Sequence, residues 1–154
     1  MDEKYLLKAI KIAEDNVKQN GGPFGAVITK DGLLLSSAGN QVIESNDPTA
    51  HAEINVIREA SRKLQTYDLG GCTIYCSCEP CPMCLAAIYW ARIDRIVFAS
   101  GRDDAKKAGF DDVWIYDELL KPAHGRVVAA QRMLNNRGKM VFRLWNEMEN
   151  RIRY

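Results

Sequence analysis

Four of the five cysteines lie within ten consecutive positions, in the stretch YCSCEPCPMC at residues 75–84. Clustered cysteines form disulfides, close a structural metal site or bind a catalytic metal. The N-terminus MDEKYLLKAIK is an acidic, amphipathic pattern and not an export signal. Because the cysteine number is also odd, we expect a cytoplasmic protein in which the cluster serves a metal and not disulfides.

Two prolines separate these cysteines into groups. Pro82 suits the first position of a helix, which places Cys81 at the N-cap and Cys84 in the first turn, so that their sulfurs can converge. Pro80 biases the residue before it toward extended backbone, so Cys78 is expected in the strand-to-helix connection or at the end of the preceding strand. A helix N-terminus lowers thiol pKa values and favours thiolates. Cys81 and Cys84 are therefore the stronger candidates for metal binding.

The tripeptide HAE at residues 51–53 supplies a nitrogen and a carboxylate. Residues two apart on a regular helix point about 200° from each other, so His51 and Glu53 cannot both bind one metal ion from the same helix face. If the metal lies beyond the N-terminal end of the helix, His51 can bind it while the longer Glu53 side chain carries protons. The alternative is a hydrogen-bonded core histidine and a glutamate that favours the helix dipole.

One nitrogen and two sulfurs, from His51, Cys81 and Cys84, suit zinc better than magnesium or calcium. Three protein ligands leave a fourth position open for water, whose pKa a catalytic zinc lowers to about 7. With Glu53 to take the proton, the set predicts a hydrolytic site with one zinc ion per subunit.

Two other sites fit the same cysteines. One is a closed zinc site with Cys78 or His124 as the fourth ligand, and the other is a redox CxxC without metal. Neither gives Glu53 a role.

Helix and strand patterns alternate along the first hundred residues. The pair Asp31 and Gly32 favours a tight hairpin turn, and Asp47 followed by Pro48 predicts a helix start near residue 48. The strand, helix, strand order around Pro82 suggests a parallel crossover. The expected elements are a helix over 3–19, strands within 23–39 on either side of the turn, a helix over 47–64, a strand over 72–77, a helix over 82–92 and a strand over 95–100.

Beyond Ser100 the patterns are weaker. We expect a loop with a helical turn over 101–112, a short helix over 113–121, a strand or a helix within 125–134 and a helical pattern over 140–152. Together the elements predict an α/β fold: a central mixed sheet of about five strands flanked by helices.

Composition and charge limit the function classes. The 154 residues are 47% apolar and 27% charged, which fits one globular domain over 1–154. The net charge is +1, but residues 1–120 carry 13 basic and 18 acidic side chains while 121–154 carry 8 and 2. Since a nucleic-acid binder usually has a basic body, a nucleic-acid partner is disfavoured. No stretch is long and apolar enough to cross a membrane.

HAE, followed by PCPMC with Cys81 30 positions after His51, resembles the HxE…PCxxC signature of the zinc-dependent nucleobase and cytidine deaminases. This resemblance implies a three-layer α/β/α cytidine-deaminase-like fold, zinc held by His51, Cys81 and Cys84, and Glu53 as general acid and base. The stretches GGPFGAVI, SNDPTAHAE, SCEPCPMCLAAIYWAR and AGFDD, with Trp145 and Tyr154 near the end, further resemble the short bacterial guanine deaminases.

The narrower resemblance implies conversion of the purine base guanine to xanthine and ammonia, in purine salvage or catabolism. It also implies a homodimer in which segment 121–154 is exchanged between subunits, with the lid residue closing its own site or the partner's. The substrate-binding residues it implies are Asn40 for a polar edge of the purine, Phe24 and Trp90 to wall or stack on the ring, Asp112 or its neighbour Asp111 for the N–H groups, and Tyr154 as the lid.

Guanine's chemistry favours the aspartate on independent grounds. Its N1 and exocyclic amine are adjacent N–H donors, so a selective site needs a carboxylate acceptor. Taken singly, these residues also have ordinary roles: Asn40 in a turn, Asp111 and Asp112 as a solvated pair, the aromatic residues in the core.

Other functions share this signature. Guanosine, cytosine or a guanine-like triazine are alternative substrates, and HAEINVIREA also resembles the tRNA adenosine deaminases. A zinc-stabilised binding module without activity is the remaining alternative. Cys72, Cys76 and Cys78 are left without an assigned role.

Overall fold

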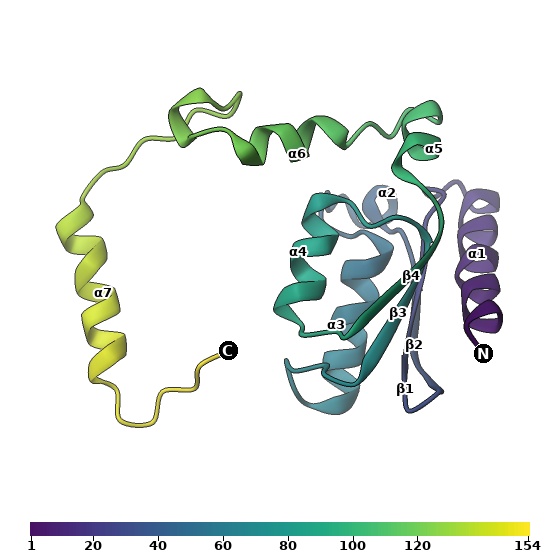
Figure 1. Cartoon of the computed structure of the whole chain (residues 1–154), viewed down its shortest axis with the longest axis horizontal. Helices are drawn as coiled ribbons and strands as arrows, with labels where there is room; N and C mark the ends of the chain where they lie inside the picture. The colour runs from purple at the N-terminus through teal and green to yellow at the C-terminus, as the bar shows by residue number, and fades with distance from the viewer. The chain divides into compact units, whose positions relative to one another are not determined.

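The computed structural model describes all 154 residues. The chain forms two compact units, Met1–Val113 and Trp114–Tyr154, which we describe separately. Figure 1 shows the elements along the chain. Those of the first unit are α1 (Asp2–Lys18), β1 (Gly25–Lys30), β2 (Leu33–Gly39), α2 (Val42–Ser45), α3 (Ala52–Leu64), β3 (Cys72–Cys78), α4 (Pro82–Trp90), β4 (Arg95–Ser100) and α5 (Arg102–Lys107).

A mixed sheet with the strand order β2-β1-β3-β4 forms the centre of the first unit. β1 pairs antiparallel with both β2 and β3, whereas β3 and β4 are parallel and joined through α4. The parallel crossover is thus confirmed. β4 pairs with no strand besides β3, so its outer edge is open.

The sheet has four strands where about five were expected. The fifth candidate lay within residues 125–134, and the structure gives neither strand nor helix over 126–134. A strand needs a neighbour to take its backbone hydrogen bonds, and the unit that contains this stretch has only helices.

The hairpin between β1 and β2 turns at Asp31 and Gly32, as predicted. Both residues have positive φ, 52° and 74°. A two-residue turn of this kind matches the twist of the flanking strands, and glycine adopts it without steric cost.

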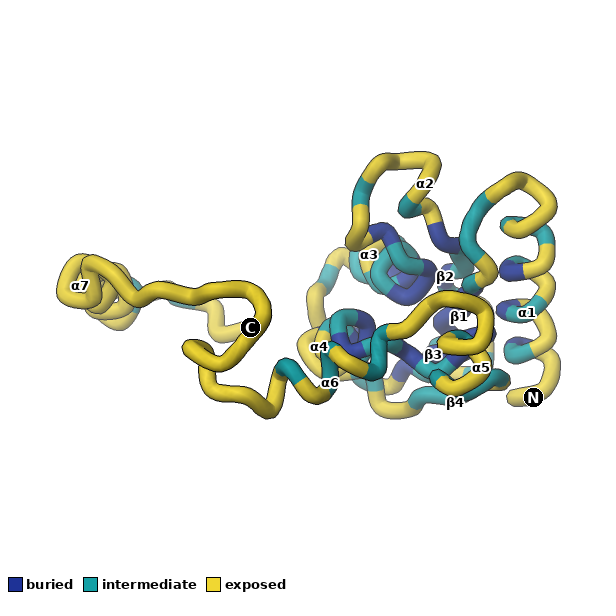
Figure 2. Tube along the Cα trace, turned by 90° about the horizontal axis from the view of Figure 1, so that it is seen from above, coloured by how far each residue is buried: buried dark blue, intermediate teal, exposed yellow.

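Helices cover both faces of the sheet, α1 one face and α3 with α4 the other (Figure 1). Alternation along β3 sends Tyr75 toward α1 and Ile74 and Cys76 toward α3. Figure 2 shows the buried positions between these layers. The expected three-layer α/β/α fold is therefore confirmed. The α3 side of the core contains Ala26, Ile28, Ala52, Val56, Ala60, Leu69, Cys72, Ile74, Cys76, Ile88 and Ala91.

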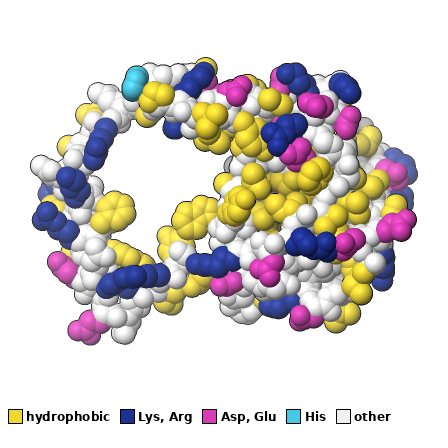
Figure 3. All heavy atoms as spheres, viewed as in Figure 1, with side chains coloured by type: hydrophobic (Ala, Val, Ile, Leu, Met, Phe, Trp, Pro, Cys, Tyr) yellow, Lys and Arg dark blue, Asp and Glu magenta, His cyan; other side chains and the backbone are white.

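The second unit, Trp114–Tyr154, has no buried residue. It contains nearly all of α6 (Val113–Leu120), then η1 (Ala123–Gly125) and α7 (Asn135–Glu147). Apolar and basic side chains lie on its surface (Figure 3). This unit therefore has no hydrophobic core of its own. Neither its helices nor those of the first unit are long and apolar enough to cross a membrane.

Two helices differ from their predictions beyond Ser100. α5 is a helix of six residues where a loop with a helical turn was expected, and α7 starts at Asn135, five residues before the predicted pattern. In both cases most of the extra residues are polar, so apolar spacing did not mark them.

Candidate active site

The start of α3 differs from the prediction in a way that matters for the site. The helix begins at Ala52 instead of near Pro48, because the Asp47 carboxylate accepts hydrogen bonds from the Thr49 N–H at 2.8 Å and hydroxyl at 2.7 Å and so closes a separate turn. His51 thereby becomes the N-cap, with extended backbone. Its ring lies beyond the end of the helix, where the prediction required it.

α4 begins as predicted, with Cys81 at the N-cap and Pro82 in the first turn. Nδ1 of His51 lies 3.6 Å from Sγ of Cys81 and 3.5 Å from Sγ of Cys84. Tetrahedral zinc with bonds of about 2.3 Å to sulfur and about 2.0–2.1 Å to nitrogen places those atoms about 3.5–3.6 Å apart. Both nitrogen–sulfur distances therefore fit a common zinc ion.

Within the Met1–Val113 unit, no fourth histidine, cysteine or acidic side chain joins this cluster. The Cys78 thiol instead donates to the Gly101 carbonyl at 3.6 Å. A closed four-ligand site with Cys78 is thus not formed, and one coordination position is open. This is the arrangement of catalytic zinc and not of structural zinc.

The two thiols differ in their pKa values. The pKa of Cys81 is lowered to about 4, chiefly by the hydrogen bond it accepts from Cys84 and also by His51. The pKa of Cys84 is raised because it donates that bond and is buried beside Glu53. The two cysteines share one proton. A bound divalent cation would displace that proton and bind both sulfurs as thiolates.

Glu53 lies in the first turn of α3 with only 7% of its surface exposed. Its Oε2 lies 3.5 Å from Sγ of Cys84. Burial raises the pKa of this carboxyl. Because a general acid and base works best when its pKa is near the operating pH, burial suits Glu53 to carry protons here.

The metal cluster opens into a cavity of about 530 Å³, a size that holds a small heterocycle. The predicted site residues that line it are Phe24, Asn40, His51, Glu53, Cys81, Asp111 and Asp112.

Asp112 has the clearest mark of a binding residue. Its Oδ1 is buried and has no hydrogen-bond partner in the protein. Burial and the nearby Cys81 raise the pKa of this carboxyl. By contrast, Asp111 accepts the Val113 N–H at 3.2 Å and pairs with Lys106 at 3.3 Å. A buried acceptor that the protein leaves unpaired costs stability unless a ligand donates to it.

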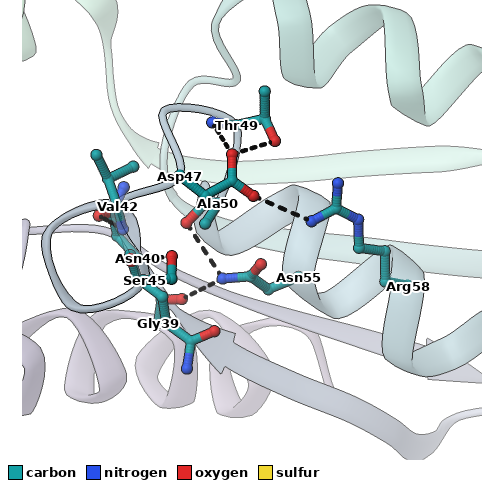
Figure 4. Close-up of polar contacts among 10 residues, drawn as sticks. Gly39, Asn40, Val42, Ser45, Asp47, Thr49, Ala50, Asn55 and Arg58 are labelled. Atoms are coloured by element: carbon teal, nitrogen blue, oxygen red, sulfur yellow. Dashed lines mark hydrogen bonds and ion pairs between the residues drawn. The ribbon is translucent and has the colours of Figure 1, made fainter.

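Asn40 is held at the end of β2 by the start of α3. Figure 4 shows Asn55 donating from its side chain to the carbonyls of Gly39 at 3.1 Å and Ala50 at 3.2 Å. Asn40 Oδ1 accepts the Val42 N–H at 3.1 Å, which directs Nδ2 to act as a donor. Asn40 is buried and lines the cavity, so this donor is available to a polar edge of a ligand.

The aromatic predictions have different outcomes. Phe24 lines the cavity and meets Phe110 edge to face, with ring centroids 5.0 Å apart. Trp90 is 68% exposed at the opposite end of α4 from Cys81, so within its own chain it does not wall the cavity. Tyr154 belongs to the second unit.

Among the lining residues that were not singled out from the sequence are Phe110, Glu79 and Arg102. Phe110 stood in the quoted stretch AGFDD, next to the aspartates that were chosen, so its position was the available signal.

A zinc position with one free coordination site, a buried proton carrier beside it and the HAE and PCPMC pair on a three-layer fold define a zinc-dependent hydrolytic deaminase. The family model described as the cytidine and deoxycytidylate deaminase zinc-binding region matches residues 1–100. The chain belongs to this family.

Two similar relatives differ in how much of the chain they match. Guanine deaminase from Bacillus subtilis (strain 168) is 45% identical over 153 residues, which cover 99% of this chain and 98% of the relative. A tRNA-specific adenosine deaminase from Aquifex aeolicus is 42% identical over 120 residues, 77% of this chain and 78% of the relative.

Solved structures give the same result. The crystal structure of the Bacillus subtilis guanine deaminase matches 99% of this chain and 98% of its own, with a TM-score of 0.96. A mutant of NE0047 in complex with 8-azaguanine matches 73% of this chain and 65% of its own at 32% identity, with a TM-score of 0.70.

Proposed function

We propose that this protein is a zinc-dependent guanine aminohydrolase that converts guanine and water to xanthine and ammonia. The observation that carries the proposal is the buried, unpaired Oδ1 of Asp112 in the cavity beside the metal cluster. Guanine supplies the adjacent N–H donors that such a carboxylate needs. The 45% identity to a guanine deaminase extends over the tail, whereas the tRNA deaminase match covers 77% of the chain.

We place guanine in the cavity between Phe24 on one side and the polar residues Asn40 and Asp112 on the other. Asp112 accepts from N1 and the exocyclic amine, Asn40 donates from Nδ2 to an acceptor on the purine, and Phe24 packs against the ring. Asp111 has protein partners already, so we assign recognition to Asp112.

Glu53 is the proton carrier in this mechanism. Zinc held by His51, Cys81 and Cys84 would act as a Lewis acid and lower the pKa of the attacking water toward neutral pH. Glu53 accepts a proton from the attacking water as its oxygen bonds to C2 of guanine, and passes that proton to N3. Glu53 then takes the proton of the new C2 hydroxyl and delivers it to the amine, so that the C2–N bond breaks, ammonia leaves and the C2 carbonyl of xanthine forms.

We also propose a homodimer in which the segment over 121–154 is exchanged between subunits and contributes Tyr154 as a lid. The support is that Trp114–Tyr154 has no buried residue although it carries apolar side chains such as Leu120 and Phe142, so it needs another surface to bury them. Trp90 is exposed and does not line the cavity of its own chain, so in this proposal it contacts a purine bound in the second subunit.

The test of the function is a substrate panel with the zinc-loaded protein and the Glu53→Ala variant. We expect ammonia release from guanine and slow or no release from guanosine, cytosine, a guanine-like triazine and tRNA. Glu53→Ala should bind zinc at the parent stoichiometry and lose about 10³-fold or more of kcat.

Lys11→Ala, which removes an exposed ion pair on α1, is the matched control and should retain the parent rate. Turnover of another substrate in preference to guanine would contradict the substrate assignment, and a near-normal rate in Glu53→Ala would contradict the mechanism.

A further inference from the structure

Glu79 is a polar residue of the cavity wall that the mechanism does not use. It lies between the end of β3 and the Cys81 N-cap of α4. Its carboxylate accepts hydrogen bonds from the guanidinium of Arg102 and, at 3.3 Å, from the backbone N–H of Arg102. Among the ion pairs of the Met1–Val113 unit this one is the least exposed, at 22% for Glu79 and 39% for Arg102.

Arg102 is the first residue of α5, whose N-cap Gly101 has no side chain to satisfy the free N–H groups of the first turn. Glu79 supplies that acceptor from a different element. Three more bonds join the two strand ends here: Glu79 N–H to the Ser100 carbonyl at 2.9 Å, the Ser100 hydroxyl to the Ser77 carbonyl at 2.9 Å, and the Cys78 thiol to the Gly101 carbonyl. The start of α5 is thus attached to the loop that carries Cys81.

The other end of α5 carries the residues that face the substrate. Gly109 has a φ of 93°, and the Phe110 N–H donates to the Ala105 carbonyl at 2.9 Å, which closes the helix end. Asp112 follows two residues later. α5 is a short helix whose C-terminal end is closed by a hydrogen bond. A shift of Arg102 at its first residue would therefore also shift Phe110 and Asp112 beyond its last residue.

We infer that Glu79 and Arg102 are a positioning pair that sets the distance between the zinc ligands and the base-recognition segment 109–112. Neither residue belongs to the metal cluster, and the proposed pose assigns neither of them a contact with the purine. It acts through α5, and a partly buried ion pair with a backbone hydrogen bond holds its geometry better than an exposed pair does. This inference rests on the proposed function for its effect on guanine.

The first measurement is steady-state kinetics on the zinc-loaded, full-length protein. Glu79→Ala and Arg102→Ala should each raise KM for guanine about tenfold and change kcat less than about threefold, because binding is weakened while Glu53 and the ligands stay in place. The double variant should be within about threefold of either single variant, since both remove one shared interaction. Glu79→Gln, which keeps an acceptor for the Arg102 N–H, should recover part of the loss.

The second measurement is amide hydrogen exchange, which needs no substrate. Exchange in 102–112 should be faster in both alanine variants than in the parent, with α3 and α4 unchanged and zinc content at parent level. Lys11→Ala is the control for removal of an ion pair elsewhere.

Loss of zinc, unchanged exchange in 102–112, or additive effects of the two single variants would each overturn the inference. If the parent protein does not turn over guanine, the proposed function fails, and the exchange data alone decide whether the pair positions this segment.

Discussion

Burial gives two acidic side chains different uses in one cavity. Glu53 is almost fully buried beside the thiols, and its pKa is raised, which suits proton transfer. Asp112 keeps one oxygen buried and unpaired, which suits recognition of N–H donors. The two carboxylates are therefore distinguished by their surroundings, in the manner of enzymes that run acid and base chemistry near neutral pH.

Asp112→Asn tests recognition at this scale. An amide is a weaker acceptor than a carboxylate and can present a donor to the N–H groups of guanine, so kcat/KM for guanine should fall about 10- to 100-fold. Steady-state kinetics on guanine measure the change. Asp111→Asn, a neighbour with its own protein partners, should remain within about threefold of the parent. Unchanged guanine kinetics in Asp112→Asn would remove Asp112 from the recognition site.

At the scale of elements, short-range chemistry made some helix starts predictable and others not. The start of α4 followed from Pro82. The start of α3 did not follow from Asp47, because the same side chain can cap a helix or close a turn, and Thr49 provided the donors for a turn. Similarly, the ligands were predictable from residue type and spacing. The role of Trp90 stays a prediction, because the helical pattern alone does not tell whether its ring serves the cavity of its own chain, which it does not line, or that of another subunit.

The attachment of α1 to the sheet gives a pH-dependent prediction. Asp2 accepts hydrogen bonds from Arg95 and Tyr75, and these lower its pKa from 3.8 to about 2. A carboxyl with a lowered folded-state pKa adds stability that is present above about pH 4 and is lost as the pH falls toward about 2. Asp2→Asn should therefore lower Tm at pH 7, by no more than about 4 °C because the pair is exposed.

Thermal melts followed by circular dichroism at pH 7, 4 and 2.5 measure this effect. The difference in Tm between parent and Asp2→Asn should shrink toward zero at pH 2.5. A difference of the same size at all three pH values would show that Asp2 acts by some means other than its charge.

At the scale of the molecule, the second unit, Trp114–Tyr154, has no buried residue, so a single chain leaves its apolar side chains exposed. Val127 and Val128, where a fifth strand was considered, are exposed and irregular, since no strand of that unit can pair with them. Local sequence patterns predicted the helices of this region approximately. They do not tell whether the apolar side chains of these helices are buried against the same chain or against another subunit. That is why the tail was assigned to dimerisation only through its family resemblance.

A complementation experiment tests the proposed exchange. Glu53→Ala has a defective site and an intact tail, and Tyr154→Ala has the reverse. If Tyr154 closes the partner's site, a co-expressed mixture of the two should recover about one quarter of the parent activity, because about half of the dimers are mixed and each has one complete site. If Tyr154 closes its own site, the mixture should have no more activity than the separate variants. Size-exclusion chromatography with light scattering should give a dimer of the 17.3 kDa chain.

The open edge of β4 has a consequence for handling the protein. The strand RIVFAS has one charged residue in six, and Phe98 is 45% exposed. An unpaired strand edge with little charge is a template for backbone pairing between molecules, which natural sheets avoid by covering the edge or placing charges on it. Preparations in which this edge is uncovered would thus aggregate while the protein is still folded. Loss of soluble protein would then show that the edge of β4 is exposed before any measurement of turnover did.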